Sequence, residues 1–519
     1  MTAIPAGEAF RTADVLRRHA ARRGDKVALR HGARELTYAQ LDERTNRLAN
    51  ALLAAGVRAG SRAAYLDRTA PEAVEVLFAA AKIGAVAVPL NWRLAPPELL
   101  AVLRDSQTPL LIAGSAYEQT TRDLVDELAG VELVMVGDGG PTGYEAWLAA
   151  HGASDPGGRG ESRDTVLQMY TSGTTGVPKG VLTTHRNLAA CVETSQRWAF
   201  DADSISMTAM PMFHIGGIGW AVCGLWNGAT TVLVSEFVPE EILDILERQR
   251  VTNTVLVPTM LQMLTALPGA AERDYSHLRA IAYGASPITT AVLKAALRTF
   301  RCALLGCYGL TETTGTVVQL DHADHDPDGP REHLLRSAGR PYPWVELRVA
   351  DPKSGVTLGP GEWGEVWIRA PNVMAGYWGR PEETAATLTP DGWLRTGDGG
   401  YLDDEGYLFL TDRIKDMIVS GGENVYPVEV EEVLSAHPAV GEVTVIGTPH
   451  ERWGETVTAL IVPRDGTACT ADELVEFARE QLAGYKLPRV IEFVEELPRT
   501  PTGKVLKRGL RERHAARAR

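Results

Sequence analysis

The fold is decided by the stretch Met169-Tyr170-Thr171-Ser172-Gly173-Thr174-Thr175-Gly176-Val177-Pro178-Lys179-Gly180. It overlaps the mostly apolar run from Thr165 to Tyr170, which predicts a buried strand. Glycines let the backbone approach a ligand closely, and hydroxyls, backbone N–H groups and a lysine side chain all bind anions. The stretch therefore predicts a phosphate-binding loop after a strand. A flexible surface turn is the alternative, but a turn does not require so many hydroxyls before Pro178 and Lys179.

The loop does not follow the pattern of P-loop nucleotide hydrolases. In that pattern the lysine comes directly after the second conserved glycine. Here Val177 and Pro178 stand between Gly176 and Lys179. The sequence therefore disfavours a P-loop hydrolase.

Length and composition indicate a globular protein of two or more domains. The chain has 519 residues, and its net charge of -14 argues against general nucleic-acid binding. Its five cysteines are scattered without a C-x-x-C pair, which indicates neither a disulfide framework nor a zinc site and fits a reduced cytoplasm. We expect no secretory signal, because the first residues lack a basic segment followed by an apolar one. We expect no membrane span, because no apolar run reaches about 18 residues.

The order of elements predicts an α/β protein with two unequal domains. Strands and helices alternate up to about residue 310, which is typical of parallel sheets covered on both faces. We expect a helix over residues 36–53 and a loop over 211–217. A surface loop at 151–163 should separate a first α/β subdomain from a second one that opens with the phosphate loop. Short strands from Val345 onward predict a small antiparallel, β-barrel-like part, and residues 412–519 a small α+β domain.

Five further motifs follow the phosphate loop. Each has a structural explanation when taken alone: a strand-end turn, a turn aspartate or a solvated lysine. In chain order they are Tyr308-Gly309-Leu310-Thr311-Glu312, Leu394-Arg395-Thr396-Gly397-Asp398, Asp412-Arg413-Ile414-Lys415-Asp416, Ser420-Gly421-Gly422-Glu423-Asn424-Val425-Tyr426-Pro427 and Pro501-Thr502-Gly503-Lys504.

The six motifs, in this order, resemble those of the adenylate-forming enzymes, which include acyl-CoA synthetases, peptide-synthetase adenylation domains and firefly luciferase. The resemblance covers nearly the whole chain. It implies a large N-terminal AMP-binding domain over residues 1–411, holding the ATP and acyl sites. It also implies a mobile C-terminal domain over residues 412–519 with its hinge at Lys415.

The resemblance also assigns roles to residues. Tyr308 would stack on adenine, Glu312 would bind Mg²⁺, and Asp398 would accept hydrogen bonds from the ribose. Arg413 would contact phosphate or ribose. The implied catalytic residues are Thr175, His214, Glu312 and Lys504. The implied ATP- and CoA-binding residues are Thr171, Ser172, Gly173, Thr174, Thr175, Lys179, Tyr308, Gly309, Thr311, Asp398, Arg413, Lys415, Gly421 and Gly422.

Gly306 departs from the family pattern, which commonly has Asn or Gln two residues before the tyrosine. A side-chain contact near the nucleotide is therefore missing, and backbone or water must replace it.

The substrate is expected to be an apolar carboxylate. Amino-acid-activating relatives place an Asp after the Phe at position 213, whereas this chain has His214. Segments 212–226 and 280–285 contain no Arg that would bind a second carboxylate. A medium- or long-chain fatty acid is favoured, and a cinnamate-type aryl acid or a steroid side-chain acid remains open. The implied substrate residues are His214, Gly216, Gly217, Tyr283, Gly284 and Ala285.

The implied reaction has two steps and uses ATP, Mg²⁺ and CoA. A carboxylate attacks the α-phosphorus of ATP and releases pyrophosphate, and a thiol then displaces AMP. A carrier protein as the acceptor in place of CoA, and a homodimer, both remain open. A nucleotide-binding regulator without catalysis is disfavoured, because Lys179, Glu312, Asp398, Arg413 and Lys504 are all present.

Two charged segments have simpler interpretations than a ligand site. The run from Asp321 to Asp328 is rich in Asp and His but has no metal-ligand motif, so we expect a solvated loop. Residues 504–519 contain seven Lys or Arg and one acid. A solvated terminal helix is favoured there, and peripheral contact with an anionic membrane remains open.

Overall fold

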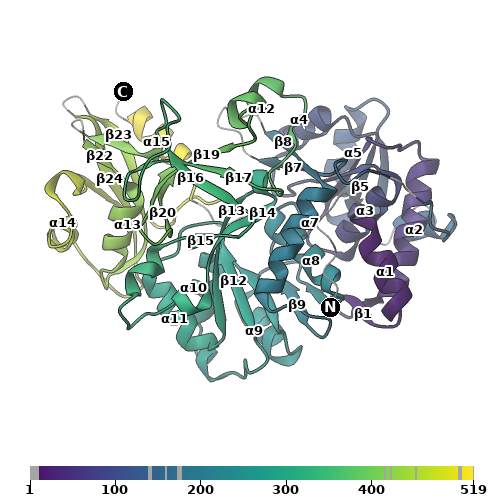
Figure 1. The fold of residues 1–519 in the computed structure, drawn as a ribbon, viewed down its shortest axis with the longest axis horizontal. Coiled ribbons are helices and arrows are strands. Elements are labelled where there is room, and N and C mark those ends of the chain that lie inside the picture. Colours follow the sequence, from purple (N-terminus) through teal and green to yellow (C-terminus); the bar gives the residue numbers. More distant parts are fainter. Residues whose placement is uncertain are drawn as a thin grey trace.

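The computed structural model describes residues 11–137, 143–157, 160–171, 178–413, 416–420, 423–450, 453–500 and 505–517. Figure 1 shows a large N-terminal part with helices on both sides of its sheets and a smaller C-terminal part at the left. The expectation of an α/β fold with a large and a small part is confirmed. None of the helices in the described ranges is both long and apolar enough to cross a bilayer.

The larger of the two main sheets has nine strands in the order β15-β14-β13-β12-β11-β9-β10-β1-β2. Its central strands are parallel, and β2, β14 and β15 are antiparallel to their neighbours. The strands are β1 (Val27–His31), β2 (Arg34–Thr37), β9 (Ile205–Thr208), β10 (Thr230–Leu233), β11 (Asn253–Leu256), β12 (Ala280–Gly284), β13 (Ala303–Leu310), β14 (Gly315–Leu320) and β15 (Arg340–Pro341).

The second main sheet has seven strands in the order β18-β8-β7-β4-β3-β5-β6. These are β3 (Arg62–Leu66), β4 (Val86–Pro89), β5 (Leu110–Gly114), β6 (Glu132–Val136), β7 (Thr165–Thr171), β8 (Lys179–Thr184) and β18 (Gly376–Tyr377). The sequence prediction of a second subdomain opening at the phosphate loop is wrong. The two strands that flank the loop, β7 and β8, complete the sheet of β3 to β6, because β7 pairs with β4.

Helices fill the space between the two sheets and cover their outer faces (Figure 1). One core cluster joins α1, α2, α3, α7 and α8 to both sheets, a second lies under α9 to α11, and a third under α4 and α5. The helices are α1 (Ala13–Arg23), α2 (Tyr38–Ala54), α3 (Pro71–Ile83), α4 (Pro96–Ser106), α5 (Glu118–Asp126), α6 (Tyr144–Ala149), α7 (His185–Thr194), α8 (Ile215–Asn227), α9 (Pro239–Arg248), α10 (Pro258–Ala266), α11 (Thr290–Phe300) and α12 (Pro381–Thr387).

Two predicted boundaries in this region are corrected. The segment expected to be helical from residue 36 begins as β2, and α2 starts at Tyr38, because Thr37 and Gln40 form a capping box there. The expected loop over 211–217 ends earlier, because Ile215 already begins α8. The first turn of α8 therefore contains Gly216 and Gly217.

Two smaller sheets complete the chain. The part predicted to be barrel-like is a four-stranded antiparallel sheet of β16 (Glu346–Ala350), β17 (Gly364–Arg369), β19 (Leu394–Leu402) and β20 (Leu408–Arg413). The C-terminal part is built from β21 (Ile418–Ser420), β22 (Glu423–Val425), β23 (Val440–His450), β24 (Gly454–Pro463), β25 (Val490–Phe493), α13 (Pro427–Ser435), α14 (Ala471–Arg479) and α15 (Lys507–Arg517). The chain thus changes sheets between Arg413 and Ile418. The predicted division at residue 411 remains a prediction.

The basic C-terminal tail is not a freely solvated helix. Leu510 of α15 is buried against the C-terminal sheet. Lys507 pairs with Glu431 at 2.9 Å, and Arg511 pairs with Asp416 at 2.5 Å. Part of the positive charge of the tail is therefore paired with carboxylates of the C-terminal part.

A buried ion pair between α2 and α3 leads to a prediction about stability. The Lys82 ammonium is fully buried and lies 2.6 Å from Asp42 Oδ1 and 2.5 Å from Asn46 Oδ1. Asp42→Asn removes the opposing charge, so we expect a loss of about 2 kcal/mol. Differential scanning calorimetry should show a lower melting temperature. Glu127→Gln, which removes the exposed Arg104–Glu127 pair, should leave the melting temperature unchanged, and equal shifts for the two variants would contradict this account.

Candidate active site

The phosphate loop is closed at its base by pairing of its two flanking strands. Thr171, the last residue of β7, pairs with Lys179, the first residue of β8. Ser172, Gly173, Thr174 and Thr175 lie outside the described residues. The observed flanks agree with the predicted strand before the loop, and Lys179 and Thr171 are neighbours across them.

Three residues predicted to bind the nucleotide come together although they are distant in the sequence. The Tyr308 hydroxyl on β13 donates to Asp398 Oδ2 on β19 at 2.7 Å. Asp398 in turn stands opposite Arg413 in the pairing of β19 with β20. The predicted adenine-stacking ring, the ribose carboxylate and the backbone of the hinge arginine therefore share one region.

Glu312 and Lys179 are linked by a residue that the sequence did not single out. Thr311 and Glu312 lie in a short 3₁₀ helix (Thr311–Thr313) after β13. The Tyr377 hydroxyl donates to Glu312 Oε1 at 2.9 Å, and Lys179 Nζ lies 5.0 Å from the centroid of the Tyr377 ring. Tyr377 thus contacts both the predicted metal ligand and the predicted phosphate-binding lysine. Its segment, residues 373–378, contains no charged residue and belongs to none of the six motifs.

Two glycines in this region have no room for a side chain. A Cβ on Gly309 would lie 1.9 Å from the Gly315 carbonyl oxygen, and a Cβ on Gly284 would lie 2.1 Å from that of Cys307. Ala285 and Thr314 adopt positive φ of 68° and 48°, an uncommon conformation for residues with a Cβ. Residues with such backbone strain are common at functional sites. The positive φ values therefore support the prediction that these strand ends form a functional site.

His214 stands at the N-cap position of α8 without a side-chain capping hydrogen bond, beside the predicted acyl residues. Its ring lies 4.4 Å from that of Phe213, and burial, with a smaller contribution from Arg93, lowers its pKa to about 4. Its buried Nε2 has no hydrogen-bond partner among the described residues. A Cβ on Gly216 would meet only Met210 Cε, at 3.5 Å, whereas one on Gly217 would meet the Pro211 carbonyl oxygen at 2.2 Å. Of these two glycines, only Gly216 leaves room for a neighbouring group.

The Tyr283 side chain points to the face of the nine-stranded sheet that is opposite α8. Ala280 and Ala282 of β12 pack in the core that contains α8, whereas Tyr283 packs in the core under α9 to α11. Its hydroxyl lies 2.8 Å from His325 Nε2, and a Cβ on Gly306 would lie 2.8 Å from the same hydroxyl. The family departure at Gly306 therefore makes room for Tyr283. A direct contact between the Tyr283 side chain and the acyl group is not supported by this orientation and remains a prediction.

The acidic segment from Asp321 to Asp328 is partly a packed structural element. His325 is buried on Tyr283, and its pKa is lowered by burial to about 4. The buried Asp324 accepts from the Tyr407 hydroxyl at 2.9 Å and pairs with Arg331 at 2.9 Å. The expectation of a wholly solvated loop is therefore wrong at these two residues.

The residues of the site fit a magnesium ion whose ligands come mainly from the phosphates of the substrate. No group of three or more His, Cys, Asp or Glu side chains that could hold a metal is found among the described residues. Mg²⁺ typically uses one or two protein carboxylates together with substrate phosphates. A single carboxylate at Glu312, near Lys179 and the phosphate loop, fits this arrangement.

Comparison with known proteins identifies the family. Residues 16–378 match the AMP-binding enzyme family, and residues 429–504 match the AMP-binding enzyme C-terminal domain. This chain belongs to the adenylate-forming enzymes. The ligases of this family that act on CoA use ATP, CoA and Mg²⁺, and the resemblance inferred from the motifs is confirmed.

Relatives of this adenylate-forming enzyme act on different acids. It is 43% identical over 490 residues to a feruloyl-CoA synthase of Amycolatopsis sp, covering 94% of this chain and 96% of the relative. It is 42% identical to the fatty acid–[acyl-carrier-protein] ligase ScoC of Streptomyces coeruleorubidus, covering 92% of each. Its fold matches ATP-bound MatB from Rhodopseudomonas palustris with a TM-score of 0.89 and 31% identity, over 98% of this chain and 100% of MatB.

Several predicted residues of this adenylate-forming enzyme are outside the described ranges. These are the hinge residue Lys415, Gly421 and Gly422 in the predicted CoA channel, and the predicted catalytic Lys504. The Arg413 side chain is also not described. Their roles remain predictions from the motifs.

Proposed function

We propose that the enzyme activates a medium- or long-chain fatty acid with ATP and transfers the acyl group to CoA, releasing pyrophosphate and AMP. The observation that carries the nucleotide half is the contact of Tyr308 with Asp398, close in the fold to the pair of Glu312 and Lys179 joined by Tyr377. These side chains offer a flat ring, a ribose acceptor, a metal ligand and a cation.

His214 is proposed to bind the substrate carboxylate. With a pKa near 4 its ring is neutral at physiological pH. A neutral imidazole with its proton on Nε2 donates one hydrogen bond without a permanent charge. The buried, unpartnered Nε2 is suited to that role. The oxygen that attacks the α-phosphorus would thus be oriented without being neutralised.

Charge neutralisation supplies the rest of the adenylation step. Lys179 is proposed to bind the phosphates, and Lys504 to stabilise the charge that shifts toward the leaving pyrophosphate. Mg²⁺ bound at Glu312 would neutralise negative charge on the same phosphates. No protein nucleophile is required, since the chain's residues mainly position the two anions.

An aryl acid is the second candidate, favoured by an aromatic stack beside α8. Trp220 is buried one helical turn beyond Gly216, about 6 Å along the helix axis. It stacks on Trp198 with centroids 5.1 Å apart and meets Phe200 edge-on at 5.1 Å. A group that lies along α8 from Gly216 would reach this stack after about the length of one aromatic ring. The similarity to a feruloyl-CoA synthase favours the same candidate.

A panel of acids distinguishes the candidates. Fatty acids from C2 to C18, benzoate, cinnamate and a bile acid would be assayed for pyrophosphate and AMP, with and without CoA. We expect the highest kcat/KM among C8 to C16 acids, with AMP release dependent on CoA. A maximum on aromatic or steroid acids would replace the fatty-acid assignment, and pyrophosphate without CoA-dependent AMP would indicate a carrier-protein acceptor.

The cytoplasm is the proposed location. All five cysteines are free thiols, which suits a reducing compartment. ATP and CoA as substrates favour the same compartment.

A further inference from the structure

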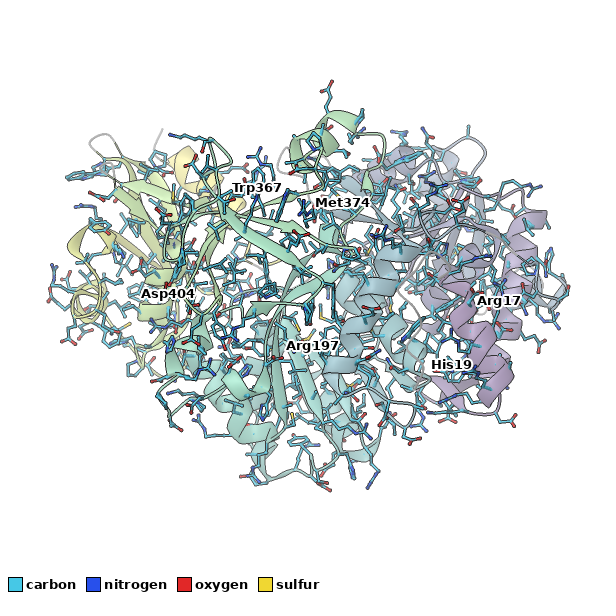
Figure 2. All side chains as sticks on the ribbon, in the orientation of Figure 1. Arg17, His19, Arg197, Trp367, Met374 and Asp404 are labelled. Carbon is cyan, nitrogen blue, oxygen red and sulfur yellow. The ribbon has the colours of Figure 1, made fainter. Side chains whose placement is uncertain are left out.

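The segment from Met374 to Arg380 runs between two parts of the nucleotide site. The Met374 N–H donates to the Glu312 carbonyl oxygen at 2.8 Å, and the Trp378 N–H donates to that of Gly180 at 2.7 Å. Its strand β18 pairs antiparallel with β8. Figure 2 labels Met374 in the upper middle of the view, below α12. The backbone of this 374–380 segment therefore bridges Glu312 and the strand that follows the phosphate loop.

The same segment is fixed to Asp105 at the end of α4. Trp378 Nε1 donates to the Asp105 carbonyl oxygen at 2.9 Å, and Arg380 pairs with Asp105 Oδ1 at 2.8 Å. The Tyr170 hydroxyl, on the strand that precedes the phosphate loop, donates to Asp105 Oδ2 at 2.7 Å. Both flanks of the loop are thus tied to the 374–380 segment.

Tyr377 is the residue of this segment that stands between opposite charges. Its hydroxyl fixes one oxygen of Glu312, and its ring face attracts the Lys179 ammonium. Among the described residues, neither Glu312 nor Lys179 forms an ion pair. Without the ring between them, the flexible lysine side chain could fold onto the carboxylate.

We propose that Tyr377 is a positioning residue that keeps Glu312 and Lys179 from neutralising each other before ATP and Mg²⁺ bind. The proposal rests on the proposed function, in which Glu312 serves the metal and Lys179 serves the phosphates. The hydroxyl sets the orientation of the carboxylate, and the ring sets the separation of the two charges. The two roles can be removed one at a time.

Isothermal titration calorimetry with ATP, once with Mg²⁺ and once with EDTA, measures both roles without turnover. Tyr377→Phe keeps the ring and loses the hydrogen bond to a charged group. We expect the gain in ATP affinity that Mg²⁺ provides to fall about tenfold, with affinity in EDTA unchanged. Tyr377→Leu loses the ring as well, so ATP affinity should fall in both conditions.

Tyr275→Phe is the matched control. The Tyr275 hydroxyl is buried in the core under α9 to α11 and has no partner among the described residues, so its removal should change neither titration. If Tyr377→Phe keeps the wild-type response to Mg²⁺, the positioning role is wrong. If the wild-type protein binds no ATP, the proposed function itself fails. Equal losses for Tyr377→Phe with Mg²⁺ and with EDTA would indicate a merely structural role and overturn the proposal.

Discussion

Lys504→Ala is expected to lose nearly all acyl-adenylate formation and to leave thioester formation from a supplied adenylate largely intact. In the first half-reaction, negative charge moves from the α-phosphate toward pyrophosphate. Lys504 is proposed to stabilise this charge as it develops, and removal of one such group typically costs 10²- to 10³-fold in rate. We expect a loss of about 1000-fold. The thiol step expels AMP and needs no such cation on the leaving pyrophosphate.

The two half-reactions can be measured separately. Pyrophosphate release from ATP and the best acid of the panel reports adenylation, and AMP release from synthetic acyl adenylate and CoA reports the thiol step. Lys353→Ala, in an exposed turn, is the control and should change neither rate. Equal losses in both half-reactions would show that Lys504 supports the fold or both steps, which would contradict a role in adenylation alone.

The separation of the two half-reactions depends on the contacts between the C-terminal part and the N-terminal part. In this structure, the Thr290 hydroxyl on α11 donates to Glu432 on α13 at 2.9 Å, and the Trp363 and Tyr426 rings lie 5.4 Å apart. Together with the Arg336–Glu432 ion pair at 4.0 Å, these polar and aromatic contacts are among those that join the two parts within the described residues. Contacts of this kind can be exchanged for others at a modest cost in free energy. A rotation of the C-terminal part between the two half-reactions requires such an exchange.

The motifs could be predicted from the sequence because each is local. Tyr308, Glu312 and Asp398 stand in short runs whose residue types already indicate their chemistry, and the structure brings Tyr308 and Asp398 within 2.7 Å. Tyr377 carries no such run. The role proposed for Tyr377 depends on its contact with Glu312, which lies 65 positions earlier in the chain. Only the tertiary structure brings these two residues together.

Sheet membership was the other feature that the sequence could not supply. In the sequence, the strands beside the phosphate loop indicate the start of a new subdomain. In the structure, β7 pairs with β4, which lies about 80 residues earlier in the chain. Register and partner depend on packing of both faces, and an all-apolar strand such as 280–284 does not show which face is which. For the same reason the orientation of Tyr283 could not be predicted, although its position at a strand end could.

Gly309→Ala is expected to weaken ATP binding by forcing β13 away from β14. An alanine Cβ would lie 1.9 Å from the Gly315 carbonyl oxygen and 2.6 Å from its carbon, and neither backbone atom can rotate away as a side chain would. The two strands must separate where their register already shifts, between Tyr308 and Gly309. That movement displaces Tyr308 and the short helix that carries Glu312. We expect ATP affinity and the adenylation rate each to fall about 100-fold, since a displacement near 1 Å can cost that much.

Two control variants distinguish this effect from general destabilisation. Gly484→Ala meets no atom within 4 Å and should behave as wild type. Gly339→Ala is the matched clash, because its Cβ would lie 1.9 Å from the Gln319 carbonyl oxygen in a backbone with φ of 99°. It should lower the melting temperature but leave ATP affinity of the folded protein within about threefold of wild type. If Gly309→Ala binds ATP as well as Gly339→Ala does, the close approach of β13 and β14 serves stability alone, and the nucleotide site does not depend on it.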